Sequence, residues 1–133
     1  MKKLFVGISS IAILFIYACS PGQAQSSSTL LPPTEFKKKW DDNIEKAVIV
    51  DVRSPEEYQD GHLHSAVNMD WNGDNFDKQI QTLDKNSPVF VYCYGGGRSS
   101  SAAKELRKQG FKNVYDLKGG FEAWREAGLP EVK

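Results

Sequence analysis

The sequence lacks an excess of charge of either sign, since 17 basic residues balance 17 acidic ones. A surface for nucleic acid or for an anionic membrane is therefore not expected. The sequence also lacks internal repeats, and its 133 residues suffice for one domain with a single hydrophobic core. We expect one globular unit that works as a monomer.

Histidine is scarce as well, because His62 and His64 are the two histidines of the chain. They lie two positions apart, and the sequence near them offers no set of further ligands for a metal ion. We therefore expect no metal site.

Long hydrophobic runs are missing except for Leu4–Ala18, which follows Lys2 and Lys3. Fifteen apolar-rich residues are short for a membrane span and are typical of a signal-peptide core. The run ends in Ile-Tyr-Ala-Cys, which resembles the lipobox of bacterial lipoproteins, with lipidation at Cys19. We predict a signal peptide over 1–18. The alternatives are cleavage after the small-x-small segment Gly22–Ala24, which would release a soluble periplasmic or secreted protein, and retention as a transmembrane anchor.

The segment 19–29 is rich in serine and glutamine and is predicted to be a tether that holds a domain over 30–133 near the periplasmic face of a membrane. The membrane would then be contacted only through the lipid. With Cys19 lipidated, Cys93 has no resolving partner in the chain, and a lone thiol in an oxidising compartment indicates chemistry. A disulfide between Cys19 and Cys93 would require the tether to fold back.

Cys93 lies between a predicted strand, Val89–Tyr92, and a predicted helix. The intervening loop contains three glycines, which permit positive φ and let successive backbone N–H groups point at one spot: Gly95, Gly96 and Gly97. The helix N-terminus adds a partial positive charge there. Such a cradle stabilises a sulfur anion, which predicts a nucleophilic cysteine. The alternative is a small buried residue that completes a core strand.

Four motifs support a resemblance to a known family. The loop C-Y-G-G-G-R-S starts at Cys93, Asp51-Val52-Arg53 and Gly61-His62-Leu63 precede it, and a segment from Gly119 to Trp124 follows it. In this order and spacing the motifs resemble the rhodanese (sulfurtransferase) domain family, from about residue 33 to 130. The resemblance implies that Cys93 carries sulfur as a persulfide and that His62 is a framework residue.

Strand and helix patterns alternate along the chain, which predicts an α/β fold with a mainly parallel central sheet of about five strands flanked by helices. The strand candidates are 47–52, 66–68, 89–92 and 114–117. Helices are predicted to begin near residues 34, 55, 76, 99 and 121. Ligands of such sheets bind beyond the carboxyl ends of the strands, where Cys93 is expected.

Asp51 and Arg53 follow a predicted strand at the same edge and are candidate supporting residues. A structural interpretation has Asp51 accepting loop N–H groups and Arg53 pairing with Glu56 or Glu57. The other interpretation has them facing the substrate.

The remaining loop residues leave alternatives open. Arg98 can face an oxyanion of thiosulfate or brace the loop against Asp51. Ser99 is expected to cap the helix, with its hydroxyl also available to the sulfur. Tyr94 stands where the rhodanese family often has an arginine. The resemblance therefore implies one cation fewer at the entrance to the active site, and less efficient use of thiosulfate.

We therefore predict an exported sulfurtransferase that moves sulfane sulfur from thiosulfate or a persulfide to a thiol or cyanide-type acceptor, with a protein as a further candidate acceptor and with no metal or organic cofactor. A persulfide carrier or redox sensor without turnover is the alternative. A phosphatase or arsenate reductase is disfavoured because those enzymes place five residues between cysteine and arginine, whereas four separate Cys93 from Arg98.

Overall fold

The structure is a computed structural model, and it describes residues 28–133. The predicted signal peptide over 1–18, the lipidation site Cys19 and most of the predicted tether over 19–29 lie outside the described residues. Within residues 28–133, no helix combines the length and the apolar character needed to span a membrane.

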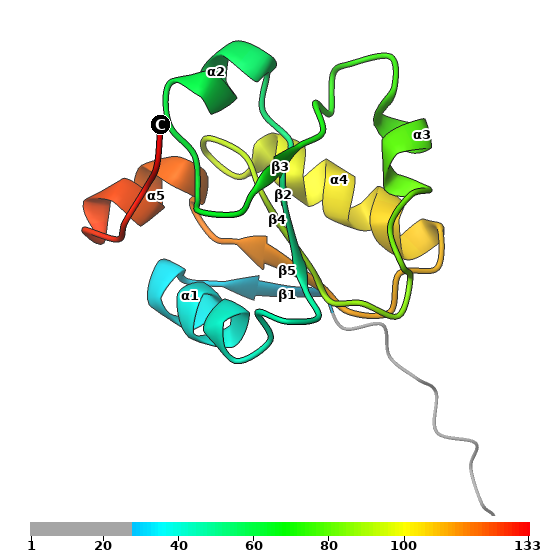
Figure 1. Ribbon diagram of the computed structural model, residues 1–133, viewed down its shortest axis with the longest axis horizontal. Coiled ribbons are helices and arrows are strands. Elements are labelled where there is room, and N and C mark those ends of the chain that lie inside the picture. The colour runs from blue at the N-terminus through cyan, green and yellow to red at the C-terminus, as the bar shows by residue number, and fades with distance from the viewer. Residues whose placement is uncertain (1–27) are drawn as a thin grey trace, which may run out of the picture.

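The fold is α/β and is built on one sheet of five parallel strands, which confirms the predicted fold class (Figure 1). The strand order is β1-β5-β4-β2-β3. The strands are β1 (Ser28–Leu31), β2 (Val48–Asp51), β3 (Val67–Asn68), β4 (Val89–Tyr92) and β5 (Val114–Leu117). The apolar runs of β2 and β4 form central strands because a parallel sheet is covered on both faces.

Helices cover the two faces of the sheet. They are α1 (Pro33–Asp41), α2 (Pro55–Gln59), α3 (Phe76–Ile80), α4 (Gly97–Lys108) and α5 (Gly120–Glu126). Residues of α3 and α4 share one core cluster with Val89, Val91 and Cys93, whereas residues of α1 and α5 share the other with Phe90 and Tyr92. This division follows from the alternation of side chains along β4.

The first strand, β1, was not among the predicted strands, and it begins two residues before the predicted start of the domain at residue 30. Ser28 and Thr29, which we assigned to the tether, belong to β1 and pair with Val114 and Tyr115 of β5. The pattern was hard to detect because β1 is a short edge strand that is followed at once by two prolines.

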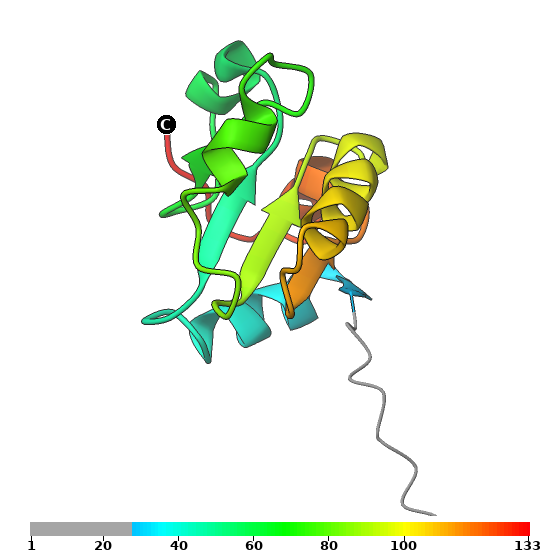
Figure 2. The ribbon, with the colours of Figure 1, turned by 90° about the vertical axis from the view of Figure 1, so that its right-hand side faces the viewer.

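The carboxyl ends of β2 and β4 lie side by side, since Asp51 pairs with Tyr92 in the register of the two strands. The chain leaves β4 at Cys93, turns, and enters α4 at Gly97 (Figure 2). The fold therefore places Cys93 at the sheet edge where the sequence predicted it.

Candidate active site

Cys93 lies at the bottom of the loop between β4 and α4. Its side chain is a free thiol and only 1% of the residue is exposed. The backbone N–H of Gly96 donates to Sγ at 3.0 Å, and the thiol donates to Oγ of Ser99 at 3.5 Å. The sulfur is therefore held by polar groups of the loop and helix that follow it.

A single glycine makes the turn of this loop. Gly96 has a φ of 111° and is the N-cap of α4 in the left-handed region, whereas Gly95 and Gly97 are not among the glycines with positive φ. The expectation that all three glycines curl the backbone was wrong, because one left-handed residue suffices to bring the Gly96 N–H onto the sulfur. The sulfur then faces the N-terminus of a 12-residue helix, where the helix dipole favours negative charge.

Ser99 does not cap α4, which corrects our prediction. The helix begins at Gly97, so Ser99 and Ser100 lie inside its first turn. Gly96 ends the loop without any side-chain cap. The Ser99 hydroxyl donates instead to the carbonyl of Gly96 at 3.2 Å and accepts from the Cys93 thiol. Its predicted proximity to the sulfur is confirmed.

Arg98 braces the loop, but against a different partner from the one predicted. Its guanidinium donates to both carboxylate oxygens of Glu57, at 2.7 and 3.0 Å. Glu57 also completes a capping box at the start of α2 with Ser54. Hydrogen bonding to Arg98 lowers the pKa of Glu57 to about 2. Arg98 therefore links the loop to α2, and the predicted brace against Asp51 was wrong because Asp51 already binds Arg53.

Asp51 and Arg53 form a buried ion pair below the rim of the site. The two residues are 0% and 2% exposed, and Nη2 of Arg53 lies 2.6 Å from Oδ2 of Asp51. The Arg53 backbone N–H donates to Asp51 at 2.9 Å, so the structural interpretation of Asp51 is confirmed. The predicted pairing of Arg53 with Glu56 or Glu57 was wrong, because the guanidinium turns inward to the carboxylate two residues before it.

This ion pair extends into a network that holds the neighbouring loops. Tyr92 donates to Asp51 at 2.5 Å and accepts from the Leu63 N–H at 3.1 Å. Arg53 donates to the carbonyl of Gly61 at 2.7 Å. Burial raises the pKa of the Tyr92 phenol, which keeps it a hydrogen-bond donor. The network supports the ends of β2 and β4.

The N-terminus of α5 also holds the loop, a role that our sequence reasoning did not assign. The N–H of Phe121 donates to the Cys93 carbonyl at 2.8 Å, and the N–H of Glu122 donates to the Tyr94 carbonyl at 3.1 Å. Gly120 has a φ of 64°, and a Cβ there would lie 2.3 Å from the Tyr94 oxygen. The paired glycines after β5 were the available signal, but the sequence does not reveal that their partner is the cysteine loop.

Tyr94 forms part of the mouth of the site. The residue is 44% exposed and borders a hollow of about 270 Å³ that is lined by Arg53, Glu57, Asp60, Tyr94 and Arg125. Arg125 comes from α5 and stacks over Phe121, with Cζ 4.2 Å from the ring centroid. Arg125 is therefore a cation at this hollow that the sequence did not indicate, because no motif or spacing links Arg125 to the cysteine loop.

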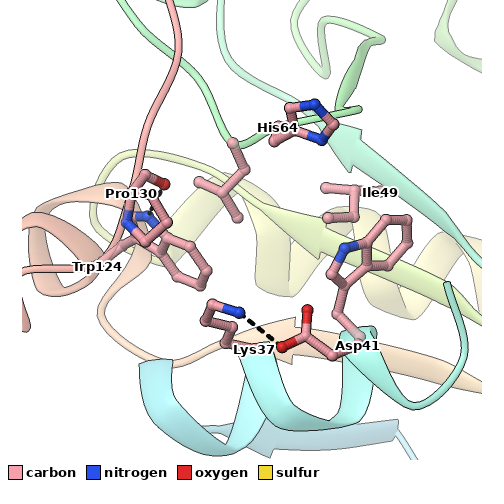
Figure 3. A pocket seen from close by; sticks show the side chains of 8 residues that line it. Lys37, Asp41, Ile49, His64, Trp124 and Pro130 are labelled. Atoms are coloured by element: carbon pink, nitrogen blue, oxygen red, sulfur yellow. Dashed lines mark hydrogen bonds and ion pairs between the residues drawn. The ribbon is translucent and has the colours of Figure 1, made fainter.

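A second, apolar hollow lies on the face of the sheet that α1 and α5 cover (Figure 3). It measures about 190 Å³, lies between Trp40 of α1 and Trp124 of α5, and has the Lys37–Asp41 ion pair at its rim. No residue of the cysteine loop lines it. Among residues 28–133, no cluster of three or more His, Cys, Asp or Glu side chains is arranged to bind a metal ion.

Comparison with known proteins gives a consistent result across sequence and structure. The family model described as the rhodanese-like domain matches residues 32–127. The chain is 46% identical over 86 residues to the thiosulfate sulfurtransferase GlpE of Pseudomonas fluorescens (strain SBW25), covering 65% of this chain and 77% of that protein.

Solved structures have the same fold. The rhodanese-like domain of the Anabaena sp. Alr3790 protein superposes with a TM-score of 0.70 at 29% identity and covers 80% of each chain. A protein of unknown function from Rhodopseudomonas palustris CGA009, described as a "Possible Tyrosine Phosphatase", superposes with a TM-score of 0.66 at 31% identity, over 82% of this chain and 88% of that one.

Proposed function

This chain belongs to the rhodanese-like domain family and is a rhodanese-type sulfurtransferase, and we propose that it carries sulfane sulfur as a persulfide on Cys93. The observation that carries the proposal is the position of Cys93 Sγ, 3.0 Å from the Gly96 N–H and at the N-terminus of α4. These groups favour a negative charge on the sulfur.

The reaction proceeds by two transfers in a ping-pong scheme. The Cys93 thiolate attacks the outer sulfur of thiosulfate, the sulfur–sulfur bond of the donor breaks, and sulfite leaves with its electron pair. The product is a Cys93 persulfide with its negative charge on the outer sulfur. An acceptor nucleophile, a thiol or cyanide, then bonds to that sulfur and the Cys93 thiolate leaves. The Gly96 N–H is aimed at the inner sulfur in advance, so the loop needs little rearrangement.

The chemistry of the loop favours this function over phosphate-ester hydrolysis. Four residues separate Cys93 from Arg98, and the Arg98 guanidinium is occupied by Glu57 through two hydrogen bonds. A cysteine phosphatase needs its arginine to hold the phosphoryl oxygens from inside the loop. A persulfide presents one sulfur anion and does not require an arginine inside the loop.

Mass spectrometry of the intact protein tests the proposal. After incubation with thiosulfate or a polysulfide, the wild type is expected to gain the mass of one sulfur atom and to lose it on addition of cyanide or a dithiol. Cys93→Ser preserves the size of the side chain and is expected to show no gain. A wild type that stays unmodified with every donor, or a gain that persists in Cys93→Ser, would contradict the proposal.

We also propose export as a lipoprotein, with Cys19 as the lipidated residue. The support is the apolar run Leu4–Ala18 with Cys19 directly after it. In a bacterial host, the full-length chain is expected to fractionate with the membrane and Cys19→Ala to be found in the soluble fraction. A wild type that is already soluble would instead favour cleavage after Ala24.

A further inference from the structure

Arg125 is the accessible cation of the hollow beside Tyr94. Two arginines line this hollow, Arg53 and Arg125. Arg53 is 2% exposed and its guanidinium turns inward to Asp51, whereas 45% of the Arg125 side chain is exposed. A substrate that enters the hollow can therefore contact the guanidinium of Arg125 but not that of Arg53.

Helix α5 places Arg125 next to the cysteine loop. The guanidinium stacks over the ring of Phe121, with Cζ 4.2 Å from the ring centroid. The backbone N–H of Phe121 donates to the Cys93 carbonyl at 2.8 Å. Tyr94, which follows Cys93 in the loop, lines the same hollow as Arg125. The guanidinium is therefore packed against the residue that holds the backbone of the nucleophile.

The C-terminal segment places a carboxylate on this cation. Nε and Nη2 of Arg125 donate to the two carboxylate oxygens of Glu131, at 2.7 and 3.1 Å. The residues on either side of Glu131 are anchored as well. Nε1 of Trp124 donates to the Pro130 carbonyl, and Val132 makes two backbone hydrogen bonds to the segment between α2 and β3. Glu131 is therefore held where it neutralises the guanidinium.

The pairing leaves one end of the guanidinium available. Nη1 of Arg125 has no hydrogen-bond partner among residues 28–133. An anion that accepts from Nη1 would lie close to the Glu131 carboxylate, and the two negative charges would repel each other. Asp60, which also lines the hollow and forms no ion pair in the described part of the chain, adds to this repulsion. The hollow thus offers a donor for an anion together with carboxylates that weaken its binding.

On the basis of the proposed sulfurtransferase function, we propose that Arg125 is a specificity-determining residue that binds the anionic group of the sulfur donor, and that Glu131 weakens this binding by neutralising the guanidinium. With thiosulfate, the sulfonate oxygens accept from Arg125 while Cys93 attacks the outer sulfur. The bond that breaks and the departure of sulfite are unchanged. An uncharged donor offers no anionic group to Arg125, so the pair acts only on charged donors.

Single replacements distinguish this role from a structural one, because the two predict different patterns. Arg125→Gln removes the cation and is expected to slow reactions of anionic reagents at Cys93. Glu131→Gln keeps the size of the side chain, removes the competing charge and is expected to speed them. If the ion pair only anchored the C-terminal segment, both replacements would act in the same direction and would affect charged and uncharged reagents alike.

The experiment measures alkylation of Cys93 in the full-length protein by iodoacetate, an anion, and by iodoacetamide, its uncharged analogue. The ratio of the two rates cancels changes in the reactivity of the thiol itself. Arg125→Gln is expected to lower this ratio about fivefold, as loss of an exposed charge contact predicts. Glu131→Gln is expected to raise it about threefold, and both effects are expected to shrink at high salt.

Lys38→Gln and Asp42→Asn are the matched controls for the two changes of charge. These residues form an exposed ion pair on α1 and do not line the hollow. Both variants are expected to keep the wild-type ratio. A ratio that changes equally in the controls would show that only the net charge of the protein matters and would overturn the proposal.

The double variant Arg125→Gln/Glu131→Gln tests whether Glu131 acts through Arg125. It is expected to match Arg125→Gln, because without the guanidinium Glu131 has no cation to neutralise. An unchanged ratio in Arg125→Gln, a ratio in Glu131→Gln that does not rise, or additive effects in the double variant would overturn the proposal. Because alkylation requires no sulfur donor, this outcome is independent of sulfur loading, which tests the proposed function separately.

Discussion

At the scale of single residues, the arginines around the cysteine loop are already ion-paired. Arg98 binds Glu57, Arg53 binds Asp51 and Arg125 binds Glu131. A donor dianion that approaches Cys93 therefore meets cations whose charge is largely compensated. Tyr94, which is 44% exposed beside the sulfur-bearing residue, adds no charge to the mouth.

Tyr94→Arg is expected to raise kcat/KM for thiosulfate, because an added cation lowers the cost of bringing a dianion to the thiolate. An exposed contact of this kind is worth about 1 kcal/mol, which corresponds to about a fivefold change in rate. Steady-state kinetics with thiosulfate at two salt concentrations measure the effect, and the gain is expected to shrink at high salt.

Tyr94→Gln is the control, since it removes the aromatic ring without adding charge. It is expected to leave the response to salt unchanged. Equal gains of Tyr94→Arg with thiosulfate and with an uncharged donor would show that position 94 acts through the shape of the loop and would contradict the electrostatic explanation.

At the scale of elements, the sequence predicted those helix and strand features that depend on a local pattern of residues. Strands β4 and β5 were predicted at their observed bounds because β4 is a short apolar run, β5 is mostly apolar, and turn residues precede and follow each of them. The start of α2 near residue 55 was also predicted, because Ser54, Pro55 and Glu57 are residue types that favour the beginning of a helix. Edge strand β1 was missed because it has one neighbour and its pattern is short.

The sequence predicted the nucleophile and its loop, but it did not predict which residues contact that loop. Cys93 and its loop follow from the strand, glycine and helix pattern. The partner of Arg98 does not, because Glu57 lies 41 positions away and several acids precede the loop. The contact of the α5 N-terminus with the Cys93 carbonyl depends on the order of the strands, which the pattern of one sequence does not determine.

The N-terminus of α5 is expected to hold the cysteine loop in place, and Gly120→Ala tests this. A methyl group at Gly120 would collide with the Cys93 and Tyr94 carbonyl oxygens, at 2.5 and 2.3 Å. We expect a loss of about 3 kcal/mol or more in the free energy of unfolding and loss of sulfur loading. Urea unfolding and intact mass spectrometry measure the two effects.

Gly128→Ala is the matched control, because Gly128 has a φ of 70° but no atom within 4 Å of a new Cβ. It is expected to cost about 1 kcal/mol from backbone strain alone and to leave sulfur loading intact. Similar effects of the two substitutions would mean that the contact between α5 and the loop does not matter for loading.

At the scale of the whole molecule, the cysteine loop is fixed from three directions. Glu57 holds it from α2 through Arg98, the N–H groups of Phe121 and Glu122 hold it from α5, and its own helix holds the sulfur through Gly96. Beneath it, the Asp51–Arg53 pair joins the ends of β2 and β4. The fold thus prearranges donors around one sulfur atom, which is the arrangement that electrostatic catalysis requires.

The central claim is that Cys93 carries sulfur between a donor and an acceptor in repeated cycles, and initial-rate kinetics test it most directly. Rates measured with thiosulfate and cyanide varied together are expected to give parallel double-reciprocal lines, as a ping-pong mechanism requires, and Cys93→Ser is expected to show no turnover. Intersecting lines, or turnover that survives in Cys93→Ser, would contradict the account.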